Sequence, residues 1–241
     1  MTTEAPPRRA NTGTLDYYLL HAEADDARPI GLLVEEFLLA DDLSATRLRS
    51  AGWTAEAFAA TGHLGAGALP TGDGWWSSAA FARAVRTDRH LRARLAATDR
   101  TTAEATYHRL GGGTLPRDEA LRGHFRDDVP LASGAPLRLG AGTDVHRVLF
   151  AGELDDRRLA SLSALLRLAA PAGTRPGVIG TGRLRVNDAN ARWDLRRVGG
   201  AWCIDVTSTP AGGDGLRWLL RQLTEAARGQ GLVPVTIDRL C

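Results

Sequence analysis

The fold is decided by residues 178–209, VIGTGRLRVNDANARWDLRRVGGAWCIDVTST. Apolar and polar side chains alternate through this stretch, and such alternation predicts strands with one buried face. Turn residues at 189–190 and the pair Gly199-Gly200 divide the stretch into three parts. It therefore predicts an antiparallel meander of three strands, over residues 178–188, 191–198 and 201–209.

Two helices and two further strands are predicted around the meander. Residues 145–153 and 233–240 are apolar enough to form strands. Residues 154–170 and 216–228 carry apolar side chains at the 3.6-residue period of a helix. The order strand, helix, three strands, helix, strand predicts an α+β fold, in which residues 144–241 form a ferredoxin-like plait with one extra central strand.

The first half of the chain is predicted to contain one strand and several helices. Residues 15–22, LDYYLLHA, are apolar and aromatic and predict a buried strand. A helix is predicted from Pro29, because proline suits the first turn and the apolar residues up to Leu38 recur at the helical period. In that helix Glu35 and Glu36 face solvent.

Further helices are predicted from Ser44 and from Thr54, and over most of residues 77–110, which end at a run of three glycines. The chain accordingly divides into a disordered tail (1–13), a mainly helical N-terminal part (14–110), an irregular connection (111–143) and the plait (144–241), which together form one composite domain or two.

The composition excludes several classes of protein. The 241 residues include 30 basic ones, all of them arginine, against 28 acidic ones, for a net charge of +2. Without lysine the chain has no amine for a Schiff base, no P-loop lysine and no kinase strand lysine. The bias toward arginine, glycine and alanine is typical of a high-GC bacterium.

The sequence predicts a cytoplasmic protein that does not enter a membrane. No apolar run approaches the ~18–20 residues of a membrane-spanning helix. Residues 1–13 lack the apolar core of a signal peptide. Two cysteines, Cys203 and Cys241, are too few for a disulfide framework or a four-thiolate zinc site.

No cofactor and no metal are predicted. The chain has no dinucleotide or phosphate fingerprint after a predicted strand. Its six histidines do not have the spacing of metal ligands. Two weaker alternatives are an iron site of His21, Glu23 and His146 and a methyltransferase-like glycine loop over residues 139–143.

The outer face of the meander is the candidate binding site. Alternation places Arg183, Arg185, Arg192 and Arg196 on the face that does not meet the helices, together with Asp205. A guanidinium group binds a carboxylate or phosphate through two parallel hydrogen bonds. We therefore predict that these arginines bind an anionic substrate; a solvated face with cross-strand Arg–Asp pairs is the alternative.

Asp205 and His146 are the candidate catalytic residues. Partial burial would raise the pKa of Asp205 toward a range useful for proton transfer, and histidine titrates near neutral pH. Trp75 and Trp76 end a glycine-rich loop and are predicted to close over the substrate, or alternatively to anchor that loop on the core. Cys203 beside arginines would have a lowered pKa.

These observations favour a cofactor-independent enzyme of the isomerase, cyclase or lyase type. Its substrate would be an organic anion, a peptide or a carrier-bound intermediate, in specialised metabolite biosynthesis. The alternative is a non-catalytic module that binds a peptide or protein through an exposed sheet edge or through residues 1–80, which carry 5 arginines against 11 acids. Nucleic-acid contact through Arg83, Arg86, His90 and Arg94 is a third hypothesis, which the low net charge does not favour.

Overall fold

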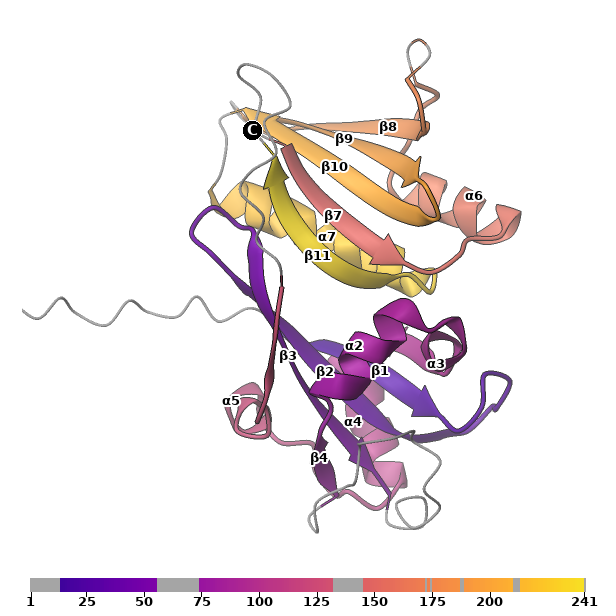
Figure 1. Cartoon of the computed structure of the whole chain (residues 1–241), viewed down its shortest axis with the longest axis vertical. Coiled ribbons are helices and arrows are strands. Elements are labelled where there is room, and N and C mark those ends of the chain that lie inside the picture. Colours follow the sequence, from indigo (N-terminus) through magenta and orange to yellow (C-terminus); the bar gives the residue numbers. More distant parts are fainter. Residues whose placement is uncertain are drawn as a thin grey trace, which may run out of the picture.

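The computed structural model describes residues 14–55, 74–131, 145–171, 173, 175–186, 189–209 and 213–240. In this part of the chain, two antiparallel sheets and six helices form a mixed α+β structure (Figure 1). The α+β prediction is therefore confirmed. The predicted tail over residues 1–13 lies outside the described residues, as does most of the glycine-rich loop before Trp75.

The N-terminal half builds a six-stranded sheet, called sheet A, with the strand order β4-β3-β2-β1-β5 and with β6 also paired to β3. Its strands are β1 (Asp16–His21), β2 (Pro29–Leu39), β3 (Ala45–Thr54), β4 (Trp75–Ser77), β5 (Leu95–Thr98) and β6 (Asp128–Pro130). The helices of this half are α2 (Ala79–Thr87), α3 (Arg89–Ala93), α4 (Arg100–Arg109) and α5 (Asp118–Arg122). The first two pack on one face of sheet A and the other two on the opposite face.

Two helices predicted in this half are wrong, because the segments form strands β2 and β3. Strand β2 is covered on both faces, so an almost continuous apolar run suits it as well as it suits a helix. Glu35 and Glu36 do not face solvent, since each is only 1% exposed. The segment from Ser44 is β3, which ends at Thr54. The helix predicted from Thr54 to Gly62 lies outside the described residues from position 56 onward.

Short strands and a short helix account for the other differences between the predicted and the observed elements of this half. Residues 77–110 are helical at both ends, but the four residues of β5 interrupt them. The connection predicted over residues 111–143 contains α5 and β6, while residues 132–144 are not described. Elements of three to five residues are too short to show a periodic pattern in the sequence. Strand β5 forms by pairing with β1, and β6 by pairing with β3. No described helix is long and apolar enough to cross a membrane.

The C-terminal half builds the five-stranded sheet B, with the order β11-β7-β10-β9-β8. Its elements are β7 (Val145–Ala151), α6 (Asp156–Leu165), β8 (Val178–Val186), β9 (Ala189–Val198), β10 (Ala201–Thr209), α7 (Asp214–Gly229) and β11 (Val233–Leu240). All seven elements were predicted. Every neighbouring pair is antiparallel, so β8 runs opposite to β7. A ferredoxin-like plait joins two parallel strands through its first helix, and this strand order does not confirm that part of the prediction.

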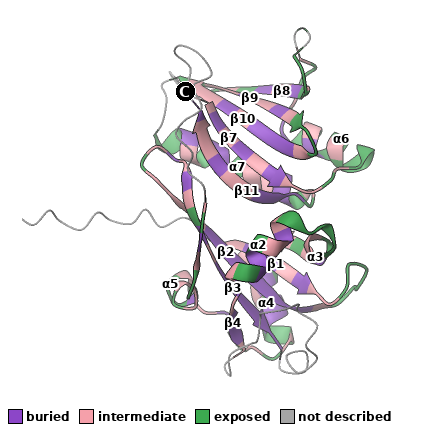
Figure 2. Cartoon of the chain, in the orientation of Figure 1, coloured by how far each residue is buried: buried purple, intermediate pink, exposed green. Residues whose placement is uncertain are grey.

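Buried residues follow the strands of both sheets (Figure 2). The core of sheet B lies between its inner face, which carries Trp193 and Phe150, and the helices α6 and α7. Leu43 and Ala45, from the end of the β2–β3 hairpin, belong to the same core. The N-terminal half therefore contributes side chains to the core of the C-terminal half.

Candidate functional site

The outer face of sheet B, opposite α6 and α7, carries the predicted arginines. Pairing of β8, β9 and β10 places residues in two rows across the strands, Arg183–Arg192–Thr207 and Arg185–Asn190–Thr209. These six residues, together with two apolar ones, line a depression of about 560 Å³, called the arginine depression. Three of the four predicted arginines therefore lie together.

This depression carries positive charge that is only partly compensated. Arg183 and Arg185 are exposed, and neither makes an ion pair with a described residue. Arg192 forms an ion pair with Asp194, and Nη2 of Arg192 lies 3.0 Å from Oδ1 of Asp194. The lining contains two threonine hydroxyls and an asparagine amide, and none of the described lining residues is acidic. The depression can therefore supply several hydrogen-bond donors to an anion.

Asp205 lies on the same outer face, but its carboxylate is already bound. Arg147 donates from Nε and Nη2 to Oδ1 and Oδ2, at 2.6 and 2.8 Å. Arg196 donates from Nη1 to Oδ2 at 3.0 Å. This is the geometry of a cross-strand ion-pair network. A substrate would have to displace a guanidinium group before it reached Asp205, and Arg196 does not line the arginine depression.

His146 lies on the opposite face of sheet B from Asp205. In the register of β7 and β10, Asp205 is paired with Arg147 and Val206 with His146, and successive residues of a strand face opposite sides. His146 is 3% exposed, and its Nε2 lies 2.8 Å from the carbonyl oxygen of Asp42, between β2 and β3. The structure does not bring the two predicted catalytic residues together. His146 instead connects sheet B to the β2–β3 hairpin.

Trp75 and Trp76 lie in the core of sheet A and not over the arginines. Trp75 stacks on His124, with ring centroids 4.8 Å apart. Trp76 packs edge-on against Phe81, at 5.8 Å. A Cβ at Gly52 would lie 2.2 Å from the Trp76 ring, so glycine is needed there. Both tryptophans are at most 4% exposed, which agrees with the alternative that they anchor their loop on the core.

No family model matches this chain, and no curated protein matches its sequence. Its function therefore has to be inferred from the chemistry of its own sites. Among the described residues, no group of three or more His, Cys, Asp and Glu side chains is placed to hold a metal ion.

One buried ion pair within the N-terminal half, which also reaches sheet B, was missed by sequence reasoning. Arg86 of α2 donates to both carboxylate oxygens of Glu35, at 3.0 and 2.9 Å. The side chains of the pair are 7% and 1% exposed. The Nε of Arg86 also donates to the carbonyl oxygen of Pro234, which belongs to β11. Arg86 therefore connects sheet A to sheet B.

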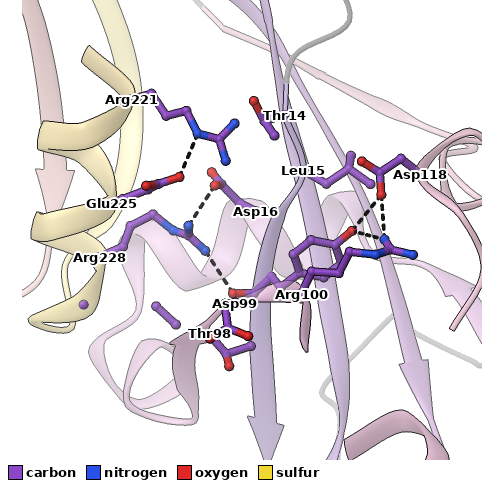
Figure 3. Close-up of a pocket in the computed structure, with 13 residues that line it drawn as sticks. Thr14, Leu15, Asp16, Thr98, Asp99, Arg100, Asp118, Arg221, Glu225 and Arg228 are labelled. Atoms are coloured by element: carbon purple, nitrogen blue, oxygen red, sulfur yellow. Dashed lines mark hydrogen bonds and ion pairs between the residues drawn. The ribbon is translucent and has the colours of Figure 1, made fainter. Parts of the chain in front are cut away.

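A second arginine, which belongs to the C-terminal half, donates hydrogen bonds to the N-terminal half. Arg228 of α7 donates to Oδ1 of Asp16 at 2.8 Å, to the Tyr18 hydroxyl at 3.0 Å and to the Tyr17 carbonyl at 2.9 Å. Figure 3 shows Arg228 reaching from α7 to Asp16 on β1. Desolvation raises the pKa of the Asp16 carboxyl, although the charge of Arg228 opposes the rise.

The basic stripe from Arg83 to Arg94 is not a continuous surface. Arg86 is buried in its pair with Glu35. Arg94 is 8% exposed, and its Nε donates to the carbonyl oxygen of His21 at 3.0 Å. Two of the four side chains on which the nucleic-acid hypothesis depended are therefore turned into the protein.

Cys203 is fully buried, and its burial raises the pKa of the thiol to about 11, with the charge of Asp205 adding to the rise. The lowered pKa expected beside arginines is therefore wrong. A rise of two units above the ordinary value of 9.0 leaves about 100-fold less thiolate near pH 8.

We therefore expect native Cys203 to be unreactive toward Ellman's reagent. A Cys241→Ser variant, in which Cys203 is the sole thiol, should release no thionitrobenzoate near pH 8 in native buffer. It should release one equivalent in concentrated guanidinium chloride, which serves as the control. Rapid release of a full equivalent from the native variant would contradict this prediction.

Proposed function

We propose that the chain is a non-catalytic binding module that takes an organic anion at the depression over β8, β9 and β10. The observation that supports this proposal is a depression lined by three arginines and by no described acidic residue. Arg183 and Arg185 have no ion pair among the described residues that a ligand would have to break. Their planar guanidinium groups suit the carboxylate and phosphate groups of small organic acids.

A cofactor-independent enzyme is the second candidate, and one observation favours it. Asp16 lines a separate cavity of about 530 Å³ between the two halves, and burial raises the pKa of its carboxyl. A raised pKa moves a carboxyl toward the range that is useful for proton transfer. Asp16 would have to exchange its hydrogen bond with Arg228 for one with a substrate. The arginine depression itself offers no such group among its described residues.

The binding proposal is tested by calorimetric titration with phosphate, pyrophosphate, succinate and citrate at low salt. We expect at least one of these anions to bind the wild-type chain. A variant with Arg183→Gln and Arg185→Gln should bind it roughly 10- to 100-fold more weakly, because it loses two charge-assisted contacts. A variant with Arg157→Gln and Arg167→Gln is the matched control, since both arginines are exposed around α6 and the charge change is the same. Absence of binding, or equal loss in both variants, would overturn the proposal.

The enzyme candidate is tested separately with succinate and citrate in D₂O, because phosphate and pyrophosphate have no carbon-bound hydrogen to exchange. Proton transfer to and from a carbon atom of the anion would introduce solvent deuterium, which mass spectrometry detects. Exchange in the wild-type chain and its loss in an Asp16→Asn variant would favour the enzyme. An unchanged mass for both succinate and citrate would contradict the enzyme candidate.

A further inference from the structure

Strand β5 is an edge strand whose outer side has no partner strand in the described part of the chain. It pairs with β1 on its other side. The His21 N–H donates to the Arg94 carbonyl, and antiparallel geometry then gives the next ladder bonds to Ala96. The N–H and C=O groups of Leu95 and Ala97 therefore point away from β1. These groups are available to a further strand.

Two cavities are lined by residues of β5. One, of about 530 Å³, lies toward Thr98, and the other, of about 630 Å³, lies toward Leu95. Ala97, Arg228 and Gly229 line both, so the cavities adjoin at the middle of β5. Figure 3 shows the first cavity between β1 and the side chains of α7.

The two ends of β5 differ in charge. The cavity at the Leu95 end, called the basic cavity, is lined by Arg89, His90, Arg92 and Arg158 against Asp25 and Glu153. The cavity at the Thr98 end has four carboxylates, and each of its three arginines is paired: Arg100 with Asp118, Arg221 with Glu225, and Arg228 with Asp16. Its fourth carboxylate, Asp99, accepts from the Thr102 N–H at the start of α4. Arg158 also lies 3.9 Å from Asp155, which is outside the lining. The lining itself has more arginines than carboxylates, so a small excess of positive charge lies at the N-terminal end of β5.

Each strand pair of sheet A is antiparallel. A peptide added antiparallel to β5 would bring its C-terminus to the Leu95 end and its N-terminus to the Thr98 end. The negative end of the peptide would then lie in the basic cavity, and its positive end beside Asp99. The direction of pairing and the distribution of charge therefore agree.

We propose that β5 binds an extended peptide by antiparallel strand addition, with the C-terminal carboxylate of the peptide in the basic cavity. Main-chain hydrogen bonds to Leu95 and Ala97 would hold the backbone, as in other cases of strand addition. Arg89, Arg92 and Arg158 would bind the carboxylate. This site is distinct from the arginine depression on sheet B and does not depend on ligand binding there.

The probe is a random hexapeptide array with free C-terminal carboxylates, screened beside the same array with C-terminal amides. We expect the wild-type chain to select carboxylate peptides, and amidation to weaken binding at least 10-fold, since a charge-assisted contact is lost. In NMR hydrogen exchange, a selected peptide should protect the amides of Leu95 and Ala97 and leave those of Arg183 and Arg185 unchanged.

Substitutions in β5 and in the basic cavity test whether the selected peptide binds at this edge. Ala97→Pro removes the N–H that faces the partner and leaves the ladder with β1 intact, so it should abolish peptide binding, whereas Ala97→Ser should retain it. The pair Arg89→Gln and Arg158→Gln should reduce affinity for carboxylate peptides to that for amides. The pair Arg183→Gln and Arg185→Gln should have no effect. Circular dichroism of each variant reports whether the fold is kept.

Several outcomes would overturn the proposal. They are an array without binders, equal binding of carboxylate and amide peptides, and full binding by a folded Ala97→Pro variant. Light scattering supplies a further one: dimerisation that Ala97→Pro abolishes would show that the open edge of β5 pairs with a second copy of the chain.

Discussion

An Arg228→Met variant should lose about 3–5 kcal/mol of its free energy of unfolding, because the change removes one partner of a buried ion pair. Arg228 is 6% exposed, and it donates to the Asp16 carboxylate, the Tyr18 hydroxyl and the Tyr17 carbonyl. Methionine fills much of the volume of the arginine stem but donates no hydrogen bond. The variant therefore leaves the Asp16 carboxylate and the Tyr17 carbonyl without the donor that α7 supplies to them.

Urea unfolding followed by tryptophan fluorescence measures this loss. The matched control is Arg221→Met, because Arg221 lies on the same helix and is also ion-paired, but both partners of its pair with Glu225 are 39% exposed. Such a pair contributes less than about 1 kcal/mol. The deficit of Arg228→Met should shrink as the pH is lowered, since protonation of Asp16 removes the uncompensated charge. Equal losses in the two variants, or a deficit that grows in acid, would contradict this prediction.

Arg86→Met should destabilise the chain by a similar amount, about 3–5 kcal/mol, for the same reason. Both carboxylate oxygens of Glu35 accept from Arg86, and the Glu35 side chain is 1% exposed. Without Arg86, the Glu35 charge remains in the core and loses this counter-ion. The Pro234 carbonyl also loses the donor that connects it to α2.

A double variant distinguishes a buried charge from a loss of packing. Glu35→Leu combined with Arg86→Met removes both charges and keeps apolar volume, so it should recover most of the stability that Arg86→Met alone loses. The free energies of unfolding of the wild type, both single variants and the double variant complete a mutant cycle. If the two losses simply add, Glu35 and Arg86 do not stabilise the chain as a coupled pair.

The sequence allowed sheet B to be predicted but not sheet A. The reason is that sheet B has one face exposed to solvent, whereas sheet A is covered on both faces. Sheet B has one helix-covered face and one polar face, so its strands alternate with period two. Strand β2 is covered on both faces, and its apolar run fits a helix equally well. Strands β4, β5 and β6 are three or four residues long and are defined by their partners.

The arginine depression was predictable because it depends on alternation and on neighbouring hairpins. The partner of Asp205 was not predictable, because Arg147 is 58 residues away in the sequence. A signal for His146 did exist: Val148 and Phe150 face the core, and period two places His146 beside them. The contact between Asp16 and Arg228 spans 212 residues, and no local pattern indicates it.

Strand β8 lies at the outer edge of sheet B, which affects how the chain behaves at high concentration. A bridge between Ala169 and Thr181 covers the beginning of this edge, and Arg183 and Arg185 follow it. Arginines on an edge strand oppose edge-to-edge pairing of two molecules, because their charges repel one another. An anion bound between them would neutralise that repulsion. The ligand that we propose for the depression would therefore also influence the solubility of the protein and its tendency to aggregate.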